Sequence, residues 1–152
     1  MYWYFVAWED QQVTRSMLAA LRGELRTHEG RAIQPSAGVI DSQSVKGADT
    51  VTRGTRGYDA GKKVNGRKRF IVTDMMGLLI VVVVLAASVQ DRDGATTTLL
   101  RSHAAAPRVR FIFADGAFAG RLVEWAARIL SIVIAVVRKP ADRQGFAVIP
   151  RR

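Results

Sequence analysis

Val39-Ile40-Asp41-Ser42-Gln43-Ser44-Val45 is the stretch from which the rest of the chain is best interpreted. Two β-branched apolar residues precede a carboxylate, and a basic segment broken by glycines follows it. This pattern predicts a strand at residues 38–41 that ends at its aspartate. Because an aspartate after two apolar residues is common, its meaning depends on the segments around it.

Length and composition define the class of protein. The chain has 152 residues, enough for one ordinary domain, and 49% of them are apolar, enough for a core. It contains no cysteine, which excludes disulfides, thiolate zinc sites and cysteine nucleophiles and fits a reducing cytoplasm. The longest apolar run, residues 78–87, is too short to cross a bilayer, and no signal peptide is recognisable. We therefore expect a soluble cytoplasmic protein without membrane association.

The net charge of +10 indicates a polyanionic partner, most often nucleic acid, although a membrane surface or solubility alone can also account for it. The charge is concentrated in residues 46–69, which hold eight cations against two acids, a net of +6. This concentration predicts contact with a phosphate backbone. The candidate DNA-binding residues are Lys46, Arg53, Arg56, Lys62, Lys63, Arg67, Lys68 and Arg69. The five glycines of the same segment predict a loop or an irregular hairpin.

The first 27 residues are expected to be helical, since Val13, Met17, Leu21 and Leu25 recur every four positions. Asp10 is a candidate helix cap. The aromatic start of the chain is expected to pack against the following core; it comprises Tyr2, Trp3, Tyr4, Phe5 and Trp8. We predict an N-terminal helical extension and linker over residues 1–35 and a core over residues 36–152.

The remaining segments predict a mixed α/β sheet covered by helices. Strands are expected at residues 70–73 and 78–85, joined by a turn that contains Asp74, with the second strand central and buried on both faces. A helix capped by Asp91 or Asp93 follows. A strand at residues 109–115 ends at Asp115, and a helix at 118–129 and a strand at 132–137 complete the order.

Two aspartates at the ends of strands in one sheet can converge on divalent metal, because neighbouring strands lie about 4.8 Å apart. Asp41 and Asp115 are the candidate pair. Their hard oxygens suit Mg²⁺ or Mn²⁺, and such ions can promote hydrolysis of a phosphodiester.

Several ordered blocks resemble bacterial insertion-sequence transposases of the Asp-Asp-Glu (DDE) class. They begin with Asp41-Ser42-Gln43-Ser44-Val45-Lys46 and continue through residues 56–63, 66–69, 89–95 and 114–116. The resemblance implies a ribonuclease-H-like catalytic core, Mg²⁺-dependent cutting of double-stranded DNA at element ends, and strand transfer to target DNA. It also implies that Asp41 and Asp115 are the first and second catalytic, metal-binding aspartates.

The chain departs from this family at both ends. In the family, a stretch like residues 145–152 is followed by a helix that bears the catalytic glutamate, and this chain ends before it. Glu124 and Asp142 are weak substitutes, and Tyr2-Trp3-Tyr4-Phe5 resembles an internal stretch of the family. We therefore expect a truncated transposase core, incomplete at its C-terminus and inactive alone. Its partner would be a full-length or second-frame transposase chain.

Two other functions remain open. The chain could be a non-catalytic DNA-binding modulator of transposition, in which case DNA binding would not depend on Asp41. It could also be a basic RNA-associated protein, which would prefer structured RNA to duplex DNA.

Overall fold

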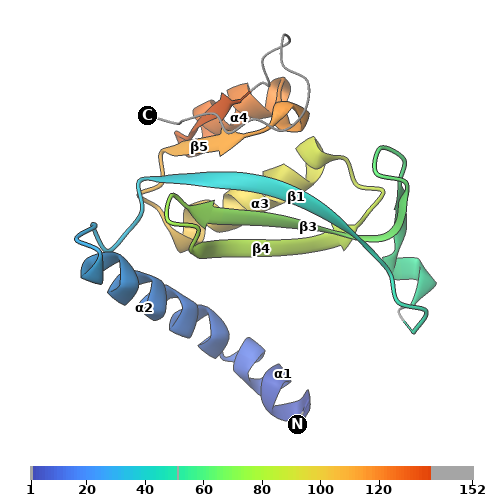
Figure 1. The fold of residues 1–152 in the computed structure, drawn as a ribbon, viewed down its shortest axis with the longest axis horizontal. Helices are drawn as coiled ribbons and strands as arrows, with labels where there is room; N and C mark the ends of the chain where they lie inside the picture. Colours follow the sequence, from blue (N-terminus) through green and yellow to red (C-terminus); the bar gives the residue numbers. More distant parts are fainter. Residues whose placement is uncertain (1, 51, 138–152) are drawn as a thin grey trace.

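A computed structural model describes residues 2–50 and 52–137. The chain forms a six-stranded sheet with helices (Figure 1). The strands are β1 (Ala37–Lys46), β2 (Gly57–Asp59), β3 (Val64–Asp74), β4 (Leu79–Ala86), β5 (Phe111–Ala114) and β6 (Val133–Val136). The helices are α1 (Tyr2–Asp10), α2 (Val13–His28), α3 (Asp91–Ala105) and α4 (Arg121–Leu130), with short 3-10 turns η1 (Arg53–Thr55) and η2 (Gly116–Phe118).

The sheet is mixed, as predicted. β1 pairs antiparallel with β3, and β3 pairs antiparallel with both β2 and β4 along its other edge. On the opposite side β1 pairs in parallel with β5, and β5 pairs in parallel with β6. This order places β1 and β5 side by side in the middle of the sheet, and it confirms the ribonuclease-H-like α/β fold class. The expected C-terminal incompleteness falls on residues 138–152, outside the described part.

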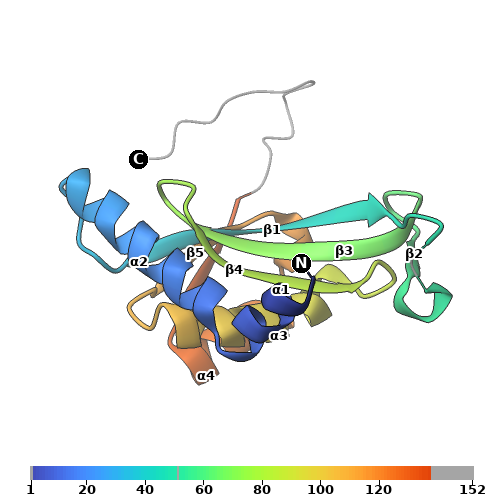
Figure 2. The ribbon, with the colours of Figure 1, turned by 90° about the horizontal axis from the view of Figure 1, so that it is seen from below.

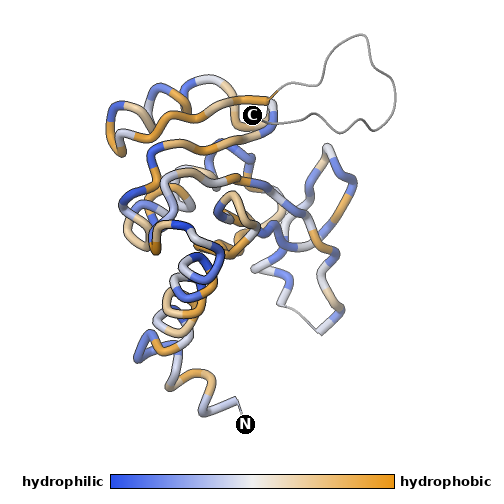
Figure 3. Tube along the Cα trace, turned by 60° about the vertical axis from the view of Figure 1, so that its left-hand side comes forward, coloured by the Kyte–Doolittle hydropathy of each residue, from blue (hydrophilic) through white to orange (hydrophobic). Residues whose placement is uncertain are grey.

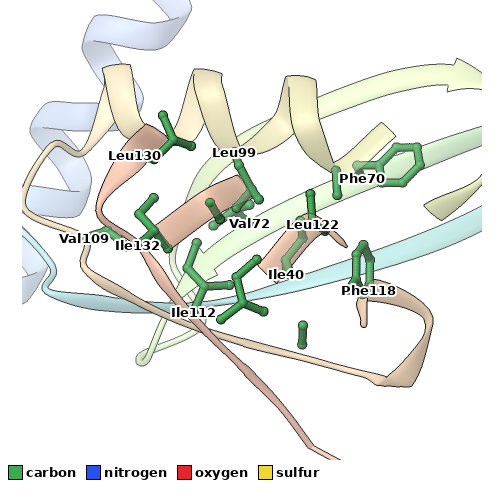
Figure 4. Close-up of a cluster of buried hydrophobic side chains, with 14 of the residues drawn as sticks. Ile40, Phe70, Val72, Leu99, Val109, Ile112, Phe118, Leu122, Leu130 and Ile132 are labelled. Carbon is green, nitrogen blue, oxygen red and sulfur yellow. The ribbon is translucent and has the colours of Figure 1, made fainter. Parts of the chain in front are cut away.

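Helices α3 and α4 cover one face of the sheet (Figure 2). Their buried residues Leu99, Leu122 and Leu130 belong to one hydrophobic cluster with Phe70 and Val72 of β3 (Figure 4). The inward residues of the other strands complete one hydrophobic core; they include Ile40, Ile80, Val83, Ile112 and Ile134. Since side chains alternate along a strand, the odd-numbered residues of β1, β3 and β5 point to the other face. We call this second face the open face.

Two strands are longer than predicted and one is placed differently. β1 continues to Lys46 and β3 begins at Val64. The two ends of the basic segment therefore belong to an antiparallel β1–β3 hairpin that extends the sheet. The expectation that residues 78–85 form a central strand buried on both faces is wrong. β4 pairs only with β3, and Val82 and Val84 are 42% and 48% exposed. A continuous β-branched run is compatible with an edge strand when one face packs on a helix.

Two predictions for the N-terminus are wrong. The aromatic residues of α1 do not pack against the core, because α1 buries none of its residues. Asp10 ends α1, and the residue that precedes α2 is Gln12, whose left-handed backbone (φ 59°) separates the two helices. Asp91 and Asp93 lie in the first turn of α3, and Gln90 is the capping residue.

Helix α2 is attached to the sheet through buried arginines. Arg26 Nη1 lies 2.5 Å from Asp74 Oδ2, and Arg22 Nη1 donates to the Leu79 carbonyl at 2.8 Å. Asp74 also accepts from the backbone N–H groups of Met76 and Leu78, so it organises the turn between β3 and β4. The domain division at residue 35 stays a prediction. Among the described residues, no helix is long and apolar enough to cross a membrane.

Candidate functional site

The parallel pairing of β1 and β5 places the two candidate aspartates just beyond the paired part of two neighbouring strands. Val39 lies opposite Phe113 in this parallel pair. The pairing ends there, so Asp41 and Asp115 each lie two residues beyond the last paired position, and Asp115 is the extended residue (φ −81°, ψ −178°) that precedes η2. Both residues lie on the open face, because each is two positions from a paired open-face residue. Both side chains are exposed.

The two carboxylates keep free oxygens. Asp115 Oδ1 accepts from the backbone N–H of Ala117 at 2.9 Å, which caps the η2 turn and fixes the side chain. Within the described residues, no hydrogen bond or ion pair engages the carboxylate of Asp41. Carboxylate oxygens are hard donors of the kind that Mg²⁺ and Mn²⁺ prefer. No group of three or more His, Cys, Asp or Glu side chains in residues 2–50 and 52–137 is arranged to hold a metal.

A row of basic side chains begins close to Asp41 on the same open face. Asp41 pairs with Ile71 across β1 and β3, Gln43 pairs with Arg69, and Val45 pairs with Arg67. Arg69 Nη2 donates to Gln43 Oε1 at 3.3 Å, which holds the guanidinium over β1. Arg69 and Arg67 therefore lie progressively farther from Asp41, towards the end of the β1–β3 hairpin.

The end of the hairpin carries the other candidate cations. The exposed ones are Lys46, Arg53, Lys62 and Lys63, and Arg56 is half-buried. Lys62 Nζ donates to the Ser42 carbonyl at 2.8 Å, and Arg56 donates to the Ala48 carbonyl. Arg67 Nη2 donates to Thr55 Oγ1 at 2.8 Å. We call these residues, together with Arg67 and Arg69, the basic tip.

Lys68 differs from the other candidates because it points to the helix-covered face and is 4% exposed. Its Nζ lies 3.0 Å from Asp91 Oδ1 and 3.2 Å from Asp59 Oδ2, and it donates to the Val89 carbonyl at 2.9 Å. We therefore leave Lys68 out of the basic tip. Its ion pairs join β2, β3 and the start of α3.

The titration of this cluster follows from its contacts. The hydroxyl of Ser44, the backbone N–H of Lys62 and the ammonium of Lys68 donate to Asp59 and hold the pKa of its carboxyl far below the usual range. Burial alone would lower the pKa of Lys68. The carboxylates of Asp91 and Asp59 outweigh burial and raise that pKa above its ordinary value.

Sequence reasoning missed this cluster, although the sequence contains a signal for it. Lys68 alternates with Phe70 and Val72, which places it among inward-facing residues of the strand. A lysine in that position requires buried acidic partners, because an unpaired buried charge is very costly.

The substitutes considered for a third carboxylate are not brought to the pair. Glu124 lies on α4, which packs against the covered face, whereas Asp41 is on the open face. Asp142 lies outside the described residues.

The comparisons with known proteins identify the family of this mixed α/β domain. A family model described as the transposase DDE domain matches residues 33–148, and the chain belongs to that family. A search of curated proteins gave no match. Among solved structures, the chain is similar to the piggyBac transposase in a synaptic complex with hairpin DNA, at 16% identity and a TM-score of 0.43. That similarity covers 73% of this chain and 24% of the piggyBac chain.

Proposed function

We propose that this chain carries two metal-binding carboxylates of a transposase site that cuts and joins DNA at insertion-sequence ends. The observation that supports this most is that β1 and β5 are parallel neighbours and that Asp41 and Asp115 each lie two residues beyond their last paired position, Val39 opposite Phe113. Mg²⁺ or Mn²⁺ held by these two residues would supply Lewis-acid chemistry at a phosphodiester. A full-length or second-frame transposase chain is the proposed protein partner.

The chain's own residues would position the DNA. Arg69 and Arg67 follow Asp41 along the open face, so they would bind phosphates next to the one that reacts. The backbone N–H of Ala117 donates to Asp115 Oδ1 and restrains this side chain.

Nicking of supercoiled DNA tests the catalytic role. With Mg²⁺ or Mn²⁺, the purified chain should nick weakly at most, and Asp41→Asn or Asp115→Asn should abolish the nicking. Asp49→Asn is the matched control, because Asp49 is an exposed aspartate in the same basic segment. Unchanged nicking by the Asp41→Asn, Asp115→Asn double variant would show that the assignment is wrong.

A second candidate function is a non-catalytic DNA-binding modulator, which the separate exposure of the basic tip favours. Changing Lys62, Lys63, Arg67 and Arg69 to Gln should lower the slope of log affinity against log salt by about 3 to 4, at about 0.9 per phosphate contact. The control changes four exposed arginines elsewhere to Gln: Arg101, Arg108, Arg110 and Arg128.

Two results distinguish the candidates, and a third tests the basic tip. Binding of duplex DNA without any metal-dependent nicking would favour the modulator. Tighter binding of structured RNA than of duplex DNA would instead favour the RNA-associated role. Equal loss of binding in the basic-tip variant and the control variant would contradict a specific basic tip.

A further inference from the structure

Tyr58 is an exposed tyrosine of β2 that lies among the cations of the basic tip. It is 57% exposed, and among residues 2–50 and 52–137 no hydrogen bond or aromatic contact engages its side chain. The segment that carries it projects beyond the sheet, and much of its chain is hydrophilic (Figures 1 and 3). A large ring is therefore displayed on a polar, cationic part of the surface.

The pairing of β2 with β3 places this ring on the open face. Tyr58 lies directly opposite Asn65, and opposite residues of an antiparallel pair project to the same face. Exposed and buried residues alternate along β3 from Asn65 onwards, and Asn65 is one of the exposed ones. Asp59, the next residue of β2, points to the covered face, where it meets Lys68. The alternation of both strands therefore gives the same direction for Tyr58.

Two polar side chains of β3 lie beside the ring. Asn65 is its opposite neighbour, and Arg67 is its diagonal neighbour, at about 7 to 8 Å in an antiparallel pair. Arg67 Nη2 donates to Thr55 Oγ1 at 2.8 Å, and Thr55 ends the η1 turn just before β2, so this bond holds the guanidinium on the side of β2. A ring, an amide and a guanidinium thus occur together on one surface.

These three groups match the three parts of a nucleotide. An aromatic ring stacks on any base, because every base has a flat face. An asparagine amide both donates and accepts hydrogen bonds, so it can pair with the edge of a base. A guanidinium binds phosphate through two parallel hydrogen bonds. Cations interspersed with aromatic side chains are typical of surfaces that bind single-stranded nucleic acid.

A fully paired duplex would make little use of the ring. Its bases are stacked on one another and present only their edges in the grooves. A protein side chain can therefore stack only on a base that has left the helix. The cations of the basic tip are sufficient for the phosphates of a duplex. The ring adds a contact that only an unpaired base can accept.

The sheet also sets the distance between this ring and the candidate metal-binding pair. Asp41 lies opposite Ile71 of β3, and Tyr58 lies opposite Asn65. The six residue steps from Ile71 to Asn65 correspond to about 20 Å, at about 3.3 Å per residue. This length equals about six stacked nucleotides of one strand, at about 3.4 Å each.

We propose that Tyr58, Asn65 and Arg67 form a binding site for one unpaired nucleotide of DNA. The ring of Tyr58 stacks on the base, the amide of Asn65 bonds to its edge, and Arg67 binds its phosphate. This site rests on the proposed function, since the same DNA would run from the unpaired nucleotide past Arg69 to Asp41. The site itself needs no metal.

Two duplexes that differ by one unpaired base test the site. The full chain is titrated, in EDTA, with a duplex that carries a single bulged 2-aminopurine, a fluorescent analogue of adenine, and with a duplex in which that base is paired. Stacking on one aromatic side chain strengthens binding by about 5- to 150-fold, so the bulged duplex should bind more tightly by a factor in this range. Fluorescence anisotropy of an end label measures both affinities.

The variants separate stacking from phosphate contact. Tyr58→Leu removes the ring but keeps an apolar side chain, so the two duplexes should then bind within about twofold of each other, at the affinity of the paired duplex. Tyr58→Phe should keep the preference, because its ring still stacks. Asn65→Ala should weaken binding of the bulged duplex only. Tyr4→Leu is the matched control, because Tyr4 is a tyrosine of similar exposure, 60%, on α1, and this variant should bind as the wild type does.

The 2-aminopurine signal reports the stacking itself. The bulged base should be quenched more strongly in the complex with the wild-type chain than in the complex with Tyr58→Leu. The proposal fails if the wild-type chain does not bind DNA or binds the two duplexes equally, or if Tyr58→Leu or Asn65→Ala keeps the full preference. Tighter binding of an RNA with the same bulge would also overturn it, because the occupant would then be RNA. Since no metal is present, the nucleotide site and the metal-binding aspartates can fail separately.

Discussion

Lys68 of β3 forms an ion pair with Asp91 at the start of α3, with 3.0 Å between Nζ and Oδ1 and only 6% of the lysine side chain exposed. A second carboxylate, Asp59 of β2, lies 3.2 Å from the same Nζ. One buried ammonium therefore links β2, β3 and the start of α3. Lys68 therefore has a structural role, although it belongs to the same basic segment, residues 46–69, as the basic tip.

Removing this ammonium should destabilise the fold. Lys68→Met would leave two carboxylates partly buried without their counter-ion, and we expect a loss of about 3 kcal/mol in the free energy of unfolding. Urea denaturation measures it. Lys63→Met, at an exposed position of the same hairpin, should change stability by less than about 0.5 kcal/mol. Equal stability of the two variants would mean that the ion pairs contribute nothing.

The depressed pKa of Asp59 predicts a loss of stability in acid. A carboxyl whose pKa is lower in the folded than in the unfolded state contributes stability above the unfolded pKa of about 3.9, and this contribution is lost as pH falls below it. The stability of the wild-type chain should therefore fall steeply between about pH 4 and pH 2, and Asp59→Asn should flatten that slope. Asp49→Asn should keep the wild-type slope, and an identical slope in the Asp59 variant would contradict the assignment.

The attachment of α2 depends on Arg26. Arg26→Ala would leave the carboxylate of Asp74 buried without its partner, which typically costs about 3 to 5 kcal/mol. Asp74 would stay in place because it also organises the β3–β4 turn. Helix α2 would lose its ion pair with the sheet, so trypsin should cleave α2 sooner in this variant. In the control variant Arg31→Ala, which changes an exposed arginine just after the helix, trypsin should cleave α2 at the wild-type rate. Unchanged protection of α2 in Arg26→Ala would show that other contacts hold the helix.

Gly94 allows α3 to approach β3 closely. A Cβ at this position would lie 2.1 Å from the ring of Phe70, which is fully buried. Gly94→Ala should therefore lower the free energy of unfolding by about 1 to 3 kcal/mol, despite the higher helix propensity of alanine. Thermal denaturation should show this as a lower melting temperature. At Thr97, an exposed position of the same helix, Thr97→Ala should be neutral or slightly stabilising. A stabilised Gly94→Ala chain would contradict this packing.

The central part of the fold was predictable because each strand has a local signature. The β-branched runs around Ile40, Val72 and Val83 mark β1, β3 and β4, and the apolar spacing of Leu122 and Ala126 marks α4. The edge position of β4 was not predictable, because an apolar run does not reveal how many neighbours a strand has. The attachment of α2 through arginines was also hidden, since it results from the long-range contacts of Arg22 and Arg26.

The candidate site was predictable only in part. The position of Asp41 and Asp115 after apolar strands is visible in the sequence, but the parallel pairing of β1 with β5, between residues more than 70 positions apart, is not. Lys68 shows the reverse case. Its charge suggests a surface residue, and only the alternation of β3 places it inside.

Mn²⁺ titration followed by NMR tests most directly whether Asp41 and Asp115 share one metal site. The paramagnetic ion broadens the amide signals of nearby residues, so it detects weak binding as well as tight binding. The signals around residues 41 and 115 should broaden together and before all others, and Asp41→Asn should remove the broadening at residue 115 as well. If the two regions broadened at different Mn²⁺ concentrations, or if broadening at residue 115 persisted in Asp41→Asn, the shared site would be contradicted.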